Sequence, residues 1–265
     1  MERLGFARNY DASLGRWMNI DPMASKYYPF STYHYSANNP IYFKDVDGRY
    51  FVGTNGKRVR IRRRRDGTLR LGRNASSDLR SLVNSINSSG SKTAVAQILK
   101  TGKNKSRVHV KIENEVHDTP GQLGYGLLGA HRAHDADGNV LVWNSEKGDF
   151  VGTPAYVEGE DGVYKEATIT IFAANIGKHE STLKEFFDRT VEQETARVFQ
   201  HETHHNTDKE FIQDLKNKRE GRENKGIGPH DNVIPQDEKV IQEILNKINK
   251  DRPLPGSAGQ AGKNN

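Results

Sequence analysis

The sequence contains no cysteine, so it can form neither a disulfide nor a thiolate metal site. Any metal ion must therefore be held by histidine and carboxylate side chains. No apolar run reaches the length of a membrane span, and we expect no membrane-spanning segment. No signal peptide is recognisable at the start, so any export signal is expected in a larger polypeptide or in a separate secretion machine.

The composition supports a folded core of modest size. Apolar residues make up 34% of the chain and charged residues 28%. We therefore expect one catalytic domain, which we place at residues 49–250. The tail at residues 251–265 is rich in Pro, Gly, Ala and Asn and is predicted to be disordered.

The most informative motif lies at residues 201–205, which fit the H-E-x-x-H pattern of zinc peptidases. In an α-helix, positions i and i+4 lie one above the other, so the imidazoles of His201 and His205 can point at one ion. Glu202 would lean over the open coordination position, where it can take a proton from water and pass it to the leaving amine. His204 faces elsewhere and is not needed. The motif predicts a Zn²⁺ site with two histidine ligands and Glu202 as general base.

A helix around this motif is predicted from the flanking sequence. Thr182 and Glu185 have the T-x-x-E spacing of a capping box, and no Pro or Gly follows before Phe211. His201 and His205 fall on the apolar stripe of this helix, where an imidazole needs a polar partner such as a metal ion. The alternative is a polar helix whose histidine-rich turn lies at the surface.

This arrangement resembles zincin-like peptidases. Residues 165–176 alternate apolar and polar side chains as a strand does, directly before the predicted metal helix. In zincin-like enzymes an edge strand at this place pairs with extended substrate, and the resemblance implies the same here. The implied fold class is α+β, with a mixed or antiparallel sheet, the HExxH helix and a following helix. Further strands are expected at residues 107–112, 129–134 and 140–144, helices at 77–86 and 93–100, and a three-stranded meander at 50–73.

A catalytic zinc usually has three protein ligands and a water, so one ligand lies outside the motif. Asp208 lies one turn further along and is better placed to orient an imidazole than to bind the ion. His230 lies in a loop whose position the sequence does not define. In gluzincin-type peptidases the third ligand is a glutamate on a following helix, and the resemblance points to Glu238, in the first turn after Pro235. Asp237 is the neighbouring alternative, and both carboxylates would also favour a helix N-terminus through the helix dipole.

The first 48 residues carry a different series of motifs. In order they are Tyr10-Asp11 with Gly15-Arg16-Trp17, Asp21-Pro22-Met23, Asn38-Asn39-Pro40 and Asp45-Val46-Asp47-Gly48. This series resembles the end of the Rhs/YD-repeat-associated core, which typically runs as Y-D-x-x-x-G-R-F/W, D-P-L, N-N-P and D-P-D-G. We therefore place the end of an Rhs core at residues 1–48.

In Rhs proteins this core closes a large β-shell, and a variable toxin domain follows it. The resemblance implies that residues 49–250 are the toxin tip of a polymorphic toxin, which hydrolyses peptide bonds with zinc. It also implies a protein or peptide substrate, an upstream Rhs shell and a cognate immunity protein. The chain is then expected to be secreted or delivered into a target cell as part of a larger bacterial protein.

The net charge of +6 and the run from Arg62 to Arg65 leave two alternatives open. We interpret the arginine run as the solvent-facing side of a strand and do not expect a nucleic-acid partner. A nuclease toxin is the main rival, although no paired-aspartate or histidine-asparagine-histidine arrangement is recognisable. The other alternative is a non-catalytic Rhs appendage in which the histidine motif is incidental.

Overall fold

The computed structural model describes residues 10–11, 16–17, 51–116 and 127–251. Contacts divide the chain into two units, Met1–Gly48 and Arg49–Asn265. In the first unit, β1 (Tyr10–Asp11) pairs antiparallel with β2 (Arg16–Trp17). The D-P-M, N-N-P and D-V-D-G motifs and residues 252–265 of the predicted tail lie outside the described residues.

A three-stranded sheet forms the centre of the second unit. Its order is β5 (Arg107–Glu113), β9 (Glu166–Phe172), β6 (Gly129–Ala133). β5 runs parallel to β9 and β6 runs antiparallel to it, so the sheet is mixed. The strand predicted at residues 165–176 ends at Phe172, where α3 (Ala173–Lys178) begins. It is the central strand, so it cannot pair with a substrate, and β6 is an edge strand among the described strands.

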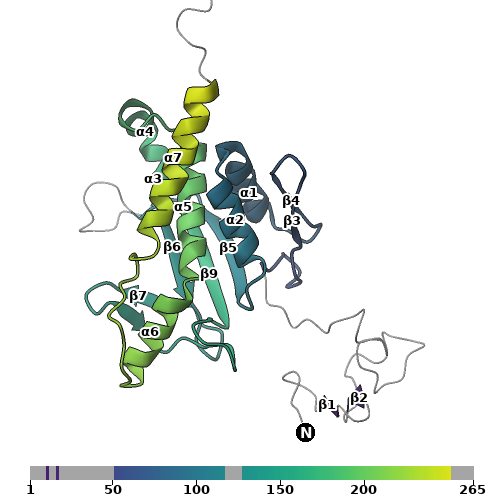
Figure 1. Ribbon diagram of the computed structural model, residues 1–265, viewed down its shortest axis with the longest axis vertical. Helices are drawn as coiled ribbons and strands as arrows, with labels where there is room; N and C mark the ends of the chain where they lie inside the picture. The colour runs from purple at the N-terminus through teal and green to yellow at the C-terminus, as the bar shows by residue number, and fades with distance from the viewer. Residues whose placement is uncertain (1–9, 12–15, 18–50, 117–126, 252–265) are drawn as a thin grey trace, which may run out of the picture. The chain divides into compact units, whose positions relative to one another are not determined.

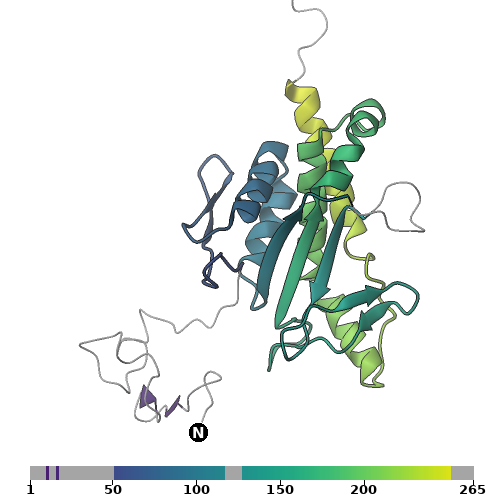
Figure 2. The ribbon, with the colours of Figure 1, turned by 180° about the vertical axis from the view of Figure 1, so that it is seen from behind.

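Helices cover one face of this sheet, as Figures 1 and 2 show from opposite sides. They are α1 (Ser77–Ser89), α2 (Lys92–Thr101), α5 (Val191–His205) and α7 (Ile234–Asp251). Their apolar side chains share one core cluster with Ile169 and Ile171 of β9. This arrangement confirms the predicted α+β class with a mixed sheet. No helix in the described part of the chain combines the length and the apolar character needed to cross a membrane.

The single helix predicted over residues 182–211 is wrong, because the chain forms three helices in this region. They are α4 (Glu180–Phe186), α5 and α6 (Lys209–Arg219). Just after α4, Asp188 has a left-handed backbone with φ of 48°. Thr190 then begins α5 with a capping box, in which its side chain accepts from the Gln193 N–H and the Gln193 side chain accepts from the Thr190 N–H. This capping box, and not the one predicted at Thr182, sets the start of the histidine helix.

A second cap separates α5 from α6. The Asp208 side chain accepts a hydrogen bond from the Phe211 N–H, and Asp208 is the N-cap of α6. The polypeptide turns at Asn206 and Thr207, so α6 does not continue the axis of α5. Asp208 therefore leaves the stripe that carries His201 and His205.

Two hairpins lie outside the central sheet. β7 (Val142–Asn144) and β8 (Asp149–Val151) form one hairpin, and β3 (Ile61–Arg63) and β4 (Leu69–Leu71) form the other. Phe150 of the first hairpin packs with Tyr164 and Phe211 in a second apolar cluster. The second hairpin replaces the predicted three-stranded meander, because its upstream partner forms only isolated bridges, such as Val52 with Arg58.

The division of contacts predicts that the second unit folds alone. Every described residue of the two apolar clusters comes from the second unit, Arg49–Asn265, which holds most of the contacts. A chain that starts at Arg49 should therefore be soluble and unfold in one cooperative transition, with a melting temperature close to that of the full chain. Calorimetry of the two chains side by side checks this. Aggregation of the shorter chain, with the full chain remaining soluble, would mean that residues 1–48 contribute to the core.

Candidate metal centre

The last two turns of α5 bring His201 and His205 together. Both are half-buried, and their Nε2 atoms lie 3.0 Å apart. Zinc bound to nitrogen at about 2.0–2.1 Å in a tetrahedral site places two ligand nitrogens roughly 3.3 Å from each other. The pair therefore has close to the separation that one shared ion requires.

A third imidazole comes from the turn before α7. The ring of His230 lies 5.3 Å from that of His201 and 5.2 Å from that of His205, measured between centroids. The ligand atoms of the three residues all lie within 4.8 Å of one another. In the described part of the chain this is the only group of His, Asp or Glu side chains that converges in this way. Three imidazoles leave a fourth tetrahedral position open, as catalytic zinc sites do.

The structure does not bring Glu238 to this cluster. Glu238 is exposed on α7, whereas Asp237 shares the buried face of that helix with Val240 and Ile244. Successive helix residues differ by about 100° in direction, so only one of the two neighbouring carboxylates can face α5. Of the alternatives considered from the sequence, His230 takes the third place in the cluster.

Asp237 forms a hydrogen bond with His201 on the side of the ring that faces away from the cluster. Its Oδ2 accepts a hydrogen bond from His201 Nδ1 at 2.7 Å and another from Arg197 at 2.8 Å. This contact leaves Nε2 of His201 to face the cluster, which is the usual orientation of a metal-bound histidine supported by a carboxylate. The orienting role expected of Asp208 therefore belongs to Asp237, because the Asp208 carboxylate instead accepts from Phe211 and Asn232.

Charges around the cluster set the protonation of its imidazoles. Burial opposes protonation of His201, but the hydrogen bond to Asp237 and the nearby carboxylates outweigh it and raise the pKa of His201. Burial, together with the neighbouring imidazoles, lowers the pKa of His205 well below its usual value. Desolvation also lowers the pKa of His230. Neutral His205 and His230 are ready to donate a lone pair to a cation.

Glu202 is buried between α5 and β6. A Cβ added to Gly129 would lie 2.7 Å from Glu202 Oε1 and 2.7 Å from a methyl of Val198, so only glycine allows this close approach. The backbone N–H of His131 also donates to the carboxylate. Burial raises the pKa of Glu202 to about 7, which is the range in which a general base works best at neutral pH.

These side chains line one cavity of about 530 Å³. Its polar lining includes Arg132, Arg197, His201, Glu202, His205 and His230. Its apolar lining includes Leu127, Leu128, Val142, Trp143, Phe150 and Phe211. The cavity therefore places a proton acceptor and three metal-ligand atoms beside a surface that suits an apolar group.

His131 on β6 also lines this cavity, although it belongs to no recognisable sequence motif. Its Nε2 lies 3.2 Å from Asn206 Oδ1, and its ring centroid is 6.3 Å from that of His205. Burial lowers the pKa of His131 to about 4, so it is neutral at neutral pH. The sequence signal was the period of two in β6, which places Gly129, His131 and Ala133 on one face.

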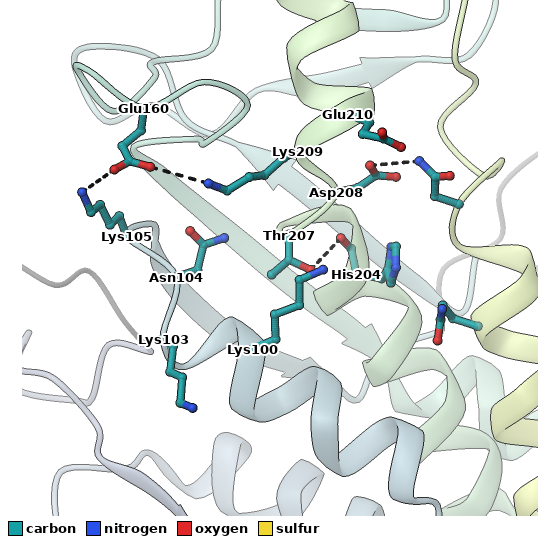
Figure 3. Close-up of a pocket in the computed structure, with 12 residues that line it drawn as sticks. Lys100, Lys103, Asn104, Lys105, Glu160, His204, Thr207, Asp208, Lys209 and Glu210 are labelled. Atoms are coloured by element: carbon teal, nitrogen blue, oxygen red, sulfur yellow. Dashed lines mark hydrogen bonds and ion pairs between the residues drawn. The ribbon is translucent and has the colours of Figure 1, made fainter.

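A larger cavity of about 680 Å³ adjoins the C-terminus of α5, where His204, Thr207 and Asp208 line it (Figure 3). Lys100 and Lys103 line it, and Lys105 and Lys209 both form ion pairs with Glu160. His204 lines this second cavity, so it faces away from the metal-ligand cluster, as its helix position predicts. The smaller cavity is therefore the candidate active site.

Comparison with protein-family models, curated proteins and solved structures found no match.

The cluster predicts that His230 is the third ligand. His230→Ala should lower zinc affinity by more than 100-fold, whereas Asp237→Asn should lower it about 10 to 100-fold, because it only orients His201. Competition titrations with a fluorescent zinc chelator measure both. Glu238→Ala is the control and should leave the affinity unchanged. If Glu238→Ala greatly lowers zinc affinity and His230→Ala does not, then Glu238 is the third ligand, as expected from the sequence.

Burial of Glu202 predicts a pH-dependent stability of the metal-free protein. The pKa of Glu202 is about 7 in the folded protein and about 4.3 in an unfolded chain. The contribution of Glu202 to the free energy of unfolding is therefore fully present below about pH 4 and is lost as pH rises through 7. At pH 8, Glu202→Gln should therefore stabilise the metal-free protein by on the order of 3 kcal/mol. Urea unfolding in EDTA at pH 8 and pH 4 measures the difference. If Glu202→Gln stabilises the metal-free protein equally at both pH values, the pKa of Glu202 is not raised.

Proposed function

We propose that this chain carries a zincin-like, zinc-dependent peptide hydrolase at the end of an Rhs-type polymorphic toxin. The observation that carries the proposal is the shared cavity of Glu202 and the cluster of His201, His205 and His230. A buried carboxylate with a pKa near neutrality beside an open metal position is the arrangement that metal-assisted hydrolysis needs.

The donor set supports zinc as the metal. Imidazole nitrogen suits zinc, copper, iron and nickel, whereas magnesium and calcium prefer oxygen. Three imidazoles with an open fourth position are typical of a catalytic zinc site. When bound there, Zn²⁺ would polarise the substrate carbonyl and lower the pKa of water at the site.

The side chains of this chain would then move the protons. Glu202 accepts a proton from the attacking water, because its carboxylate is buried next to the cluster and is largely ionised above pH 7. The same carboxyl returns that proton to the leaving amine. Asp237 keeps Nε2 of His201 directed at the metal during both steps, and Arg197 keeps Asp237 in place.

The edge position of β6 favours an extended peptide as substrate. β6 pairs with β9 on one side, and among the described strands none pairs with its other side. β6 also lies directly against α5, since Gly129 contacts Glu202. A peptide that pairs with this edge by backbone hydrogen bonds would run past the cluster. The apolar lining of the cavity would take one of the side chains of that peptide.

The Rhs context rests on the motifs of the first 48 residues. Their order and spacing resemble the end of an Rhs core, and the second unit begins directly after them, at Arg49. This context supports an upstream shell, a cognate immunity protein that protects the producing cell, and delivery into a target cell. It also supports a protein substrate whose cleavage is toxic.

Glu202→Gln tests the proposed reaction. The variant should retain zinc and lose at least about 100-fold in proteolytic rate, because it removes the proton acceptor without removing a ligand. Zinc content by elemental analysis and cleavage of a peptide library are measured on the same preparation. Glu238→Gln, which makes the same chemical change on the exposed face of α7, is the matched control and should keep full activity.

Three results would count against this assignment. Loss of zinc in Glu202→Gln would show that Glu202 is a ligand. Full activity of the same variant would show that Glu202 is not the proton acceptor. Metal-dependent cleavage of nucleic acid by the parent protein, lost in the same variant, would favour the nuclease alternative instead.

A further inference from the structure

The positive charge of this protein is concentrated in the β3–β4 hairpin. Residues 57–73 contain nine basic side chains and one acidic side chain, a formal charge of +8. The whole chain carries +6, so all the remaining residues together carry −2. The basic character of the chain is therefore a local property of one hairpin and not a general property of its surface.

The hairpin directs four of its arginines to one side. Val59 and Leu69 are buried in the core cluster, and Ile61 and Leu71 pack against it. Two hydrogen bonds between the side chain of Asn87 in α1 and the backbone of Leu69 fix this orientation. The period of two in a strand then places the intervening arginines on the outer side. We call this set, Arg60, Arg62, Arg64 and Arg70, the arginine face, and all four of its side chains are exposed.

No ion pair relieves the charge repulsion on the arginine face within the described part of the chain. Arg62 lies directly opposite Arg70 in the strand register, where two like charges destabilise a hairpin. No side chain of the arginine face forms an ion pair with another described residue. The one acidic residue of the hairpin, Asp66, accepts hydrogen bonds from Thr68, and these bonds, with the nearby charge of Arg64, lower the pKa of Asp66. The β7–β8 hairpin, which is equally short, has Glu146, Lys147 and Asp149 and no such excess.

The chemistry and spacing of the arginine face suit phosphates. Guanidinium groups form paired hydrogen bonds with phosphate oxygens, and eight of the nine basic side chains in residues 57–73 are arginine. Side chains on one face of a strand repeat every 6.4–6.8 Å or so, about twice the axial spacing of 3.4 Å between phosphates along one DNA strand. A two-stranded β-ribbon also has the width that the major groove of a duplex admits.

We propose that the arginine face binds the phosphate backbone of duplex nucleic acid without sequence preference, in contrast to the purely solvent-facing role expected from the sequence. Residues 57–73 contain no aromatic side chain, so the hairpin lacks the stacking surface that single-stranded nucleic acid uses. The arginine face also carries no exposed apolar side chain that could insert into a lipid surface. This surface differs from the metal cavity in residues and elements, and the proposal does not depend on the proposed hydrolysis.

The salt dependence of binding tests the proposal. Fluorescence anisotropy of the full chain with a labelled DNA duplex of about 20 base pairs should give a slope of log affinity against log salt of roughly −3.6, if four phosphates are contacted. Replacing the four arginines of the arginine face by Gln should remove most of this slope, because each lost phosphate contact lowers it by about 1. The variant should keep its zinc content and its cleavage rate, and its melting temperature should not fall, since the repulsion between Arg62 and Arg70 is gone.

A matched variant controls for net charge. Lys184, Lys218, Lys239 and Lys250 are exposed on α4, α6 and α7, and their replacement by Gln removes the same four charges. This control should keep the parent slope and affinity. An equal loss in the control would overturn the assignment to the hairpin, and so would failure of the parent to bind duplex DNA at 50 mM salt. Tighter binding to vesicles with 30% phosphatidylserine than to the duplex would overturn nucleic acid as the partner.

Discussion

The close contact between α5 and β6 is the constraint on which the candidate site depends. Gly129 has no side chain, and the space that a Cβ would fill is occupied by Glu202 and Val198. This contact removes the Glu202 carboxylate from water and raises its pKa to about 7. It also brings the face of β6 that carries His131 against the helix that carries His201 and His205. A larger residue at position 129 would therefore alter the acid–base properties of the site as well as its packing.

A buried network of charges connects this contact to the remaining helices. Asp237 of α7 bonds to His201 and Arg197 of α5, and Arg197 also pairs with Glu194, which in turn pairs with Arg189. Buried charges are costly unless each has a partner, so removing one member would leave the others unpaired. The network thus gives α7 a fixed position relative to α5. Because His230 lies just before α7, the same network also determines where the third imidazole can lie.

The sequence predicted those parts of the site that depend on local periodicity. The helical repeat was enough to place His201 and His205 side by side, and the strand repeat was enough to identify β9 and β6. His230 could not be placed because it lies in a turn, where no repeat applies. The choice of Glu238 over Asp237 depended on the rotation of α7, which is set by the burial of Val240 and Ile244 against other helices. The break between α5 and α6 was not predicted either. Asp208 caps a new helix there, but its position also fits the stripe of the preceding helix, so the sequence pattern did not mark the break.

Net charge alone was a poor guide to function in this chain. A value of +6 is compatible with a basic catalytic cleft, yet only two guanidinium groups line the metal cavity, those of Arg132 and Arg197, and Arg197 is paired with the Asp237 carboxylate. The excess charge lies instead on a hairpin that packs against α1 and α2, away from the α5–β6 contact (Figure 1). Mutations at sites without shared partners usually act additively. The hairpin and the cavity share no hydrogen bond or ion pair among the described residues, so nucleic-acid binding and hydrolysis should be separable by substitution.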